Sequence, residues 1–235
     1  MMKNLAFVTR ITLLTLSLGF VSYTFAQDNV RQSVNEVSTP SMQQEIQSPL
    51  SILQHEWAHI NYELEDKQKE KAFVTLMEKA KLFVTKNPNN PELIIWQGII
   101  QSSAAGAKGG LGALEYAKAA RKSFEHAMRL EENALAGSAM TSLGVLYHKL
   151  PGWPISFGND KKAEKLLKHA LEINPNGIDP NYFYAEFLYD NGKYDQARAY
   201  AKKAKQAPAR AERPLADLGR KQEISRLEDK LAQKS

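Results

Sequence analysis

The stretch that decides the fold is NYFYAEFLYDNGKYDQARAYAKKAKQAP, residues 181–208. Apolar and small residues recur in it at three- and four-residue steps on both sides of Asn191 and Gly192, which are typical turn residues. The pattern predicts two amphipathic helices joined by a short turn. Ala185 on the first helix and Ala197 on the second would let the two helices pack closely.

The same stretch resembles the tetratricopeptide repeat (TPR), a helix–turn–helix unit of 34 residues. The matching positions are Asn181, Tyr184, Ala185, Leu188, Gly192, Asp195, Ala197, Ala201, Ala204 and Pro208. An earlier unit follows the same pattern through Met140, Leu143, Gly144, Tyr147, Ala163, Leu167, Ala170 and Pro175. Ala163 and Ala197 are 34 positions apart, which is the repeat period.

Two more degenerate units precede these, around Ile94 and Gly98 and around Trp57 and Ile60. Since one helix pair cannot bury its apolar face alone, the pairs are expected to stack. We therefore expect an all-α, TPR-like right-handed superhelix of about four helix pairs over residues 48–208. Residues 209–235 are expected to form a C-terminal capping helix over the last repeat.

The N-terminus differs in character from the rest of the chain. Residues 1–26 have basic residues, a short apolar run and a small-x-small end, which predicts a secretory signal peptide cleaved after Ala26. Residues 27–47 are polar and predict a flexible leader. The chain has no cysteine, which excludes disulfides and a lipidated cysteine. We expect a periplasmic protein that does not span the membrane after cleavage.

Charge is uneven along the chain. The net charge is +5, and residues 198–235 hold an excess of Lys and Arg. This excess indicates either an acidic partner or, more simply, a solvated helix face. Export argues against nucleic acid as a partner.

Residues 55–59, HEWAH, match the H-E-x-x-H signature of zinc peptidases, with Glu78 at the spacing of a third ligand. On a helix, however, His55 and His59 lie opposite the apolar stripe of Trp57, Ile60 and Leu64. Glu78 points away from the stripe of the next helix by the same count. We therefore expect no catalytic residues, no cofactor and no metal, with a two-histidine site at His55 and His59 as the alternative.

Two insertions lengthen the repeats, within residues 102–118 and 148–162. Insertions in repeat proteins map to loops, often on the binding face. The second brings Trp153 and Phe157 into a turn-rich loop, either as a wall for a ligand or as a hydrophobic plug between repeats.

In TPR proteins the first helix of each pair lines the concave groove. The candidate groove residues are His55, Tyr62, Glu65, Thr141, His148, Tyr182, Glu186 and Tyr189. We expect this groove to bind a protein or peptide partner without catalysis. A homo-oligomer is possible. A transporter-associated protein that binds a solute or lipophilic ligand is the first alternative, and a zinc peptidase the second.

Residues 90–225, above all the insertion loop and the segment NPNGIDPNYFY, are similar to exported bacterial TPR proteins. They also resemble the periplasmic TPR (T) component associated with TRAP transporters. This resemblance implies an all-helical periplasmic scaffold that binds protein or a small hydrophobic ligand.

Overall fold

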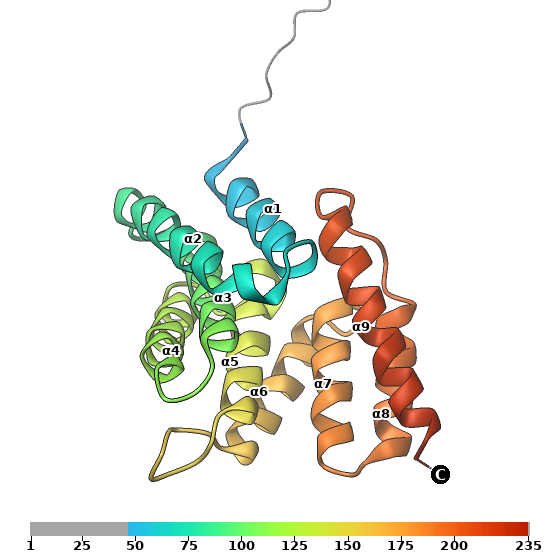
Figure 1. Ribbon diagram of the computed structural model, residues 1–235. Coiled ribbons are helices and arrows are strands. Elements are labelled where there is room, and N and C mark those ends of the chain that lie inside the picture. Colours follow the sequence, from blue (N-terminus) through green and yellow to red (C-terminus); the bar gives the residue numbers. More distant parts are fainter. Residues whose placement is uncertain (1–46, 235) are drawn as a thin grey trace, which may run out of the picture. The chain divides into compact units, whose positions relative to one another are not determined.

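The computed structural model describes residues 47–234. The predicted signal peptide and nearly all of the predicted leader lie outside these residues. Within them the chain forms α-helices joined by short loops, with no strand (Figure 1). The elements are α1 Pro49–Tyr62, α2 Asp66–Lys86, α3 Pro91–Lys108, α4 Ala113–Leu130, the short turn η1 Ala134–Gly137, α5 Ser138–Lys149, α6 Asp160–Ile173, α7 Ile178–Asp190, α8 Tyr194–Lys205 and α9 Pro214–Ala232. The predicted TPR-like superhelix of four helix pairs and a C-terminal helix is confirmed.

Local sequence signals explain where the helices begin. The hydroxyl of Ser48 accepts a hydrogen bond from the backbone N–H of Ser51 at 3.1 Å, and Pro49 occupies the first helical position. Asn90 caps α3 in the same way, with Pro91 next. Such caps satisfy backbone donors that would otherwise lack partners at the helix start.

Small residues set how closely the helices of a pair approach. A Cβ atom on Gly98 would lie 2.6 Å from the ring of Phe124, and one on Gly144 would lie 2.8 Å from Leu167. Both partners are fully buried, and burying a side chain of this size contributes about 2–3 kcal/mol. The two glycines therefore have the packing role that the repeat pattern predicts.

Helix α9 does more than cover the last repeat. Its second half packs Ile224, Leu227 and Leu231 into the core formed with α7 and α8. Its first half places Ala216 in the core of α1, α2 and α3. Figure 1 shows its N-terminal end beside α1. The helix thus connects the first and last pairs, which the repeat pattern did not predict.

None of the helices within residues 47–234 is long and apolar enough to cross a membrane.

Candidate functional site

A cleft of about 1100 Å³ runs along the concave side of the helix stack. Its walls come from the first helix of each pair, namely α1, α3, α5 and α7, and from the start of α9. Because α9 contacts α1, one side of the cleft is closed by the chain itself. The TPR expectation that first helices line the concave surface holds for this cleft.

Most of the cleft wall is apolar. Trp57 and Trp96 lie edge to face with ring centroids 5.7 Å apart, and Ile99, Val145 and Phe183 continue the surface. Both insertions contribute further apolar atoms to the same cleft, through Leu111, Leu114, Leu150, Pro151 and Ile155. The wall suits a ligand with an elongated apolar body.

A cluster of charged side chains forms the end of the cleft next to α9. The carboxylate of Asp179 on α7 accepts hydrogen bonds from Arg210 at 2.7 Å and from Arg220 at 2.8 Å. Asp217 accepts two bonds from Arg210 at 2.6 Å, one of them from its backbone N–H. Burial alone would raise the pKa of Asp179, but Arg220 and then Arg210 outweigh it and hold that pKa well below its ordinary value. Asp179 is therefore a stable anion that ties α7 to α9.

Arg213 belongs to the same end of the cleft but has a different environment. Its guanidinium lies 4.9 Å from the ring centroid of Trp96, and its Nε is buried without a hydrogen-bond partner among the described residues. Burial, and after it the nearby charge of Arg210, lowers the pKa of Arg213. The neighbouring arginines are neutralised by carboxylates, whereas Arg213 rests on an aromatic face.

The backbone is strained where η1 meets the cleft. Leu135 has φ 48° and Ala136 has φ 52°, both in the left-handed region, and Gly137 follows at φ 76°. Two consecutive non-glycine residues in this region are uncommon and cost of order 1–3 kcal/mol each. Both line the cleft. Such strain concentrates at functional sites.

The H-E-x-x-H residues take part in ordinary structural contacts. His55 and His59 are both exposed. The His55 ring nitrogen Nε2 lies 2.9 Å from the backbone oxygen of Glu212, and His59 Nδ1 lies 2.6 Å from Glu63. Glu56, the residue that would be the general base, forms an ion pair with Lys79 on α2. Across residues 47–234, no three potential ligands of the His, Cys, Asp or Glu type come together in a way that could hold a metal ion.

Of the predicted groove residues, Thr141 lines the cleft. The ring of Tyr62 packs on Trp57 and against α9, and burial raises its pKa to about 12. Tyr182 lies beneath Arg220, whose guanidinium is 4.6 Å from its ring centroid. Glu65 follows the end of α1 and forms a capping box at the start of α2.

The remaining predicted groove residues lie on α5 and α7. His148 is hydrogen-bonded to Asp160 at 2.8 Å and to Asp190 at 2.9 Å. Glu186 lies 3.4 Å from Lys149. Tyr189 packs on Tyr194, with ring centroids 5.6 Å apart. None of the three is part of the cleft lining, because their helix faces turn toward neighbouring helices or solvent.

The two aromatic residues predicted in the second insertion separate. Phe157 packs edge to face on Tyr147, with centroids 5.6 Å apart, and lies under Arg121. The side chain of Trp153 is 90% exposed. The cleft lies beside this loop through Leu150, Pro151 and Ile155 instead.

Sequence reasoning missed Trp96 and Arg213. A signal was available for both. Trp96 is an aromatic residue in the first helix of a repeat, and Arg213 stands directly before Pro214, a residue typical of helix starts. Their meeting across the cleft depends on how α9 folds back, which no local pattern encodes.

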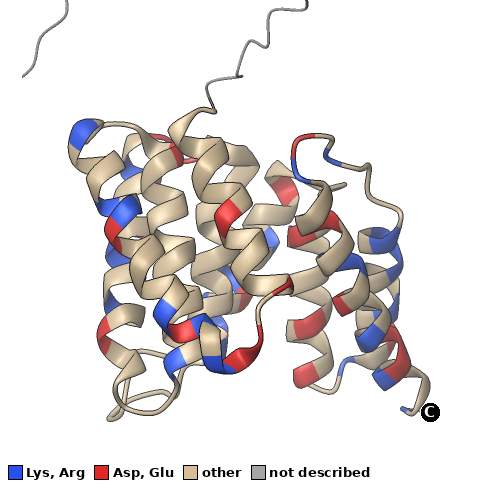
Figure 2. Ribbon diagram, turned by 45° about the horizontal axis from the view of Figure 1, so that its top comes forward, with Lys and Arg blue, Asp and Glu red and all other residues tan. Residues whose placement is uncertain are grey.

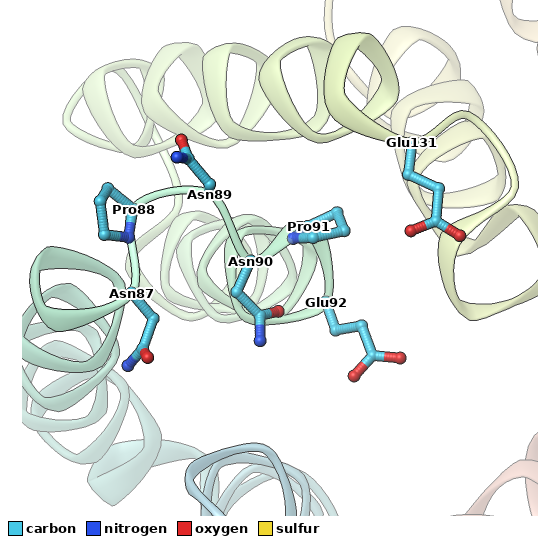
Figure 3. A pocket seen from close by; sticks show the side chains of 7 residues that line it. All are labelled: Asn87, Pro88, Asn89, Asn90, Pro91, Glu92 and Glu131. Carbon is cyan, nitrogen blue, oxygen red and sulfur yellow. The ribbon is translucent and has the colours of Figure 1, made fainter.

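A second, smaller hollow of about 470 Å³ lies at the turn between α2 and α3. Figure 3 shows Glu92 and Glu131 reaching toward it from α3 and from the end of α4. Its asparagines serve the helices: Asn87 donates to the carbonyl of Phe83, and Asn90 caps α3. These contacts describe a helix turn rather than a binding site.

Of the eleven Lys and Arg residues in the basic C-terminal segment 198–235, four form ion pairs within residues 47–234. Figure 2 shows blue and red segments interleaved on the helices next to the C-terminus. Lys205 binds Glu228 at 2.7 Å, and Arg198 binds Asp195 at 2.7 Å. The charge excess is therefore neutralised only in part, and most of the other basic residues of this segment are exposed, in keeping with a solvated helix face.

Comparison with known proteins agrees with the helical repeats. Residues 157–215 match the family model of the tetratricopeptide repeat, which covers α6, α7, α8 and the loop that leads to α9. No curated protein matches the chain. The chain thus contains a TPR segment, and proteins with such repeats commonly mediate protein interactions.

Proposed function

We propose that this protein is an exported, non-catalytic binding protein whose central cleft takes an extended, largely apolar segment of a partner protein. The observation that carries the proposal is the cleft itself, which is apolar along most of its length and closed on one side by the contact of α9 with α1. A cleft that is closed on one side is less suited to a folded domain. It suits an extended chain end that buries apolar side chains along the wall.

Export to the periplasm rests on the sequence of residues 1–26, with their basic start, apolar run and cleavage site. The absence of catalysis is supported by the use of Glu56 in an ion pair and of His55 and His59 in separate contacts.

The second candidate function is the binding of a small lipophilic ligand as an accessory of a transporter. The cleft volume of about 1100 Å³ favours it, because this is close to the upper end of small-molecule pockets. Both insertions also add apolar atoms to the wall.

The first experiment asks whether the cleft binds apolar groups at all. Titration with the neutral apolar dye N-phenyl-1-naphthylamine should give saturable fluorescence enhancement in the wild type. The variant Ser142→Trp places a bulky ring on the cleft wall and should weaken binding at least tenfold. Ser225→Trp, at an exposed position of α9 outside the cleft, is the matched control. A wild type that binds no dye, or equal binding in all three proteins, would argue against the proposal.

The second experiment separates the two candidates. A photoreactive benzoylphenylalanine at Val145 of the cleft should crosslink to a polypeptide in cells if the partner is a protein. A small lipophilic ligand should instead remain with the purified protein and add a discrete mass in native mass spectrometry.

A further inference from the structure

Four cationic side chains line the cleft, and three of them are neutralised. Lys149 is bound to Asp190 at 2.9 Å, Arg210 is bound to Asp179 and Asp217, and Arg220 is bound to Asp179 and Glu223. Arg213 forms no ion pair with any residue in 47–234. It is therefore the cleft-lining cation that keeps its hydrogen-bonding capacity available.

The acids near Arg213 are either bound to other arginines or form no ion pair with it. Asp179 is shared by Arg210 and Arg220, and Asp217 accepts from both the backbone and the side chain of Arg210. Glu212, the preceding residue, also lines the cleft, but it is exposed and its carboxylate forms no ion pair with Arg213. A guanidinium does not lose its proton in a protein, so the positive charge of Arg213 stays in the cleft.

The position of the guanidinium is fixed by an aromatic ring. Arg213 is the residue directly before α9, and its guanidinium lies over Trp96 at 4.9 Å from the ring centroid. Stacking leaves the edge of the planar group free to make two parallel hydrogen bonds, which is the geometry that a carboxylate accepts. Because Nε is buried, the edge that a ligand can reach is the one formed by the two terminal nitrogens of the guanidinium.

The apolar wall of the cleft begins next to the guanidinium of Arg213 and extends along α3. Along α3 the cleft is lined from Trp96 to Gly106, about 15 Å at the rise of a helix. Leu111 continues the wall beyond the end of α3. A ligand with an anionic end at Trp96 thus has roughly 15 Å of apolar surface to lie against.

We propose that Arg213 binds the terminal carboxylate of the cleft's ligand, whose apolar chain extends along α3 toward the two insertions. This inference rests on the proposed function, namely that the cleft is a binding site. The carboxylate could belong to the C-terminus of a peptide or to a long-chain carboxylic acid, and the experiment distinguishes these sources.

The test compares acids with neutral analogues of the same shape. Two pairs of probes are used. The first pair is dodecanoate and dodecanol. The second is an acetylated apolar pentapeptide with a free C-terminal carboxylate and the same peptide with a C-terminal amide. Binding is followed by the fluorescence of Trp57 and Trp96, which line the cleft. In at least one pair the acid should bind at least tenfold more tightly than its neutral analogue, since a bidentate, charge-assisted contact is lost in the latter. The pair that binds identifies the source of the carboxylate.

Variants assign the preference to the side chain. Arg213→Gln should bring the acid to the affinity of the neutral analogue and leave the affinity of the neutral analogue within twofold. Arg213→Lys keeps the charge and should retain part of the preference, which guards against a folding defect in the first variant. Arg226→Gln, at an exposed position of α9 outside the cleft, is the control and should bind like the wild type.

The results distinguish a failure of the role of Arg213 from a failure of the proposed function of the cleft. Equal affinity for acid and neutral analogue in the wild type, or an acid preference that survives in a folded Arg213→Gln protein, overturns the role of Arg213 but leaves the cleft as a binding site. Failure of all four probes to bind overturns both.

Discussion

The ring of Tyr62 on α1 occupies the space that a side chain at Gly219 on α9 would need. A Cβ atom at Gly219 would lie 2.3 Å from Cδ1 of Tyr62, closer than real side chains approach. This contact joins the first helix of the stack to the last. The closure of the cleft therefore depends on a residue without a side chain.

We predict that Gly219→Ala separates α9 from α1. Overpacking of this kind costs about 1–3 kcal/mol, because the clash is with the base of an aromatic ring and not with a flexible chain end. Urea unfolding followed by circular dichroism would measure the loss. Gly106→Ala is the control: this glycine is exposed on α3, a methyl group added to it would meet nothing within 4 Å, and the substitution should stabilise the protein. Equal stability of Gly219→Ala and the wild type would mean that α9 does not hold α1 in this way.

Asp179→Asn should destabilise the protein strongly near neutral pH. The substitution removes the anion that Arg210 and Arg220 share, and leaves the guanidinium of Arg220 buried with a weaker set of partners. Breaking such a pair costs about 3 kcal/mol, the lower end of the range, since Asp179 is partly exposed.

The pH dependence of this loss gives a second check. The pKa of Asp179 in the folded state is below its ordinary value of 3.8, so the carboxylate stabilises the fold above that value and the contribution fades as the pH falls further. The difference in unfolding free energy between wild type and Asp179→Asn should be constant from pH 5 to 7 and shrink below pH 4. A difference that stays constant down to pH 2 would contradict the assignment.

Ala136→Gly should stabilise the protein by about 0.5–1 kcal/mol. Ala136 has φ 52°, where glycine avoids the penalty of a side chain in the left-handed region, and this gain exceeds the entropy that glycine loses on folding. The matched control is Ala199→Gly, at an exposed position inside α8, which should destabilise by about 1 kcal/mol. The same substitution with opposite signs at two sites would establish the strain by thermal or urea unfolding. Destabilisation at both sites would refute it.

The H-E-x-x-H motif should prove structural. Purified protein is expected to retain no stoichiometric zinc and to leave casein intact. Glu56→Gln should change the unfolding free energy by less than about 1 kcal/mol, because Glu56 and Lys79 form a half-exposed pair. Stoichiometric zinc that is lost in His59→Ala, together with casein cleavage, would instead establish a metallopeptidase.

The fold could be predicted because its signals are local. Gly98 and Gly144 mark close approaches inside a helix pair, and each meets a partner on the next helix of the chain, Phe124 and Leu167. The first turns of α1 and α3 are likewise predicted from adjacent residues, namely the caps Ser48 and Asn90 and the proline that follows each. These features recur with the repeat, so several weak signals support one another.

The site was less predictable because it depends on contacts between distant residues. Asp179, at the start of α7, binds Arg210 and Arg220, which are 31 and 41 positions away. The left-handed turn at Leu135 and Ala136 has none of the Gly or Asn residues that usually announce one at these positions. Geometry between repeats, rather than the pattern within them, determines the cleft.

The contact between α1 and α9 also limits how this protein can change in evolution. An open solenoid can gain or lose a repeat at either end, since each unit contacts only its neighbours. Here the chain returns to its own beginning, so an added or deleted helix pair would pull Gly219 away from Tyr62 and alter the width of the opening. The number of repeats thus determines the size of the ligand that the cleft can hold.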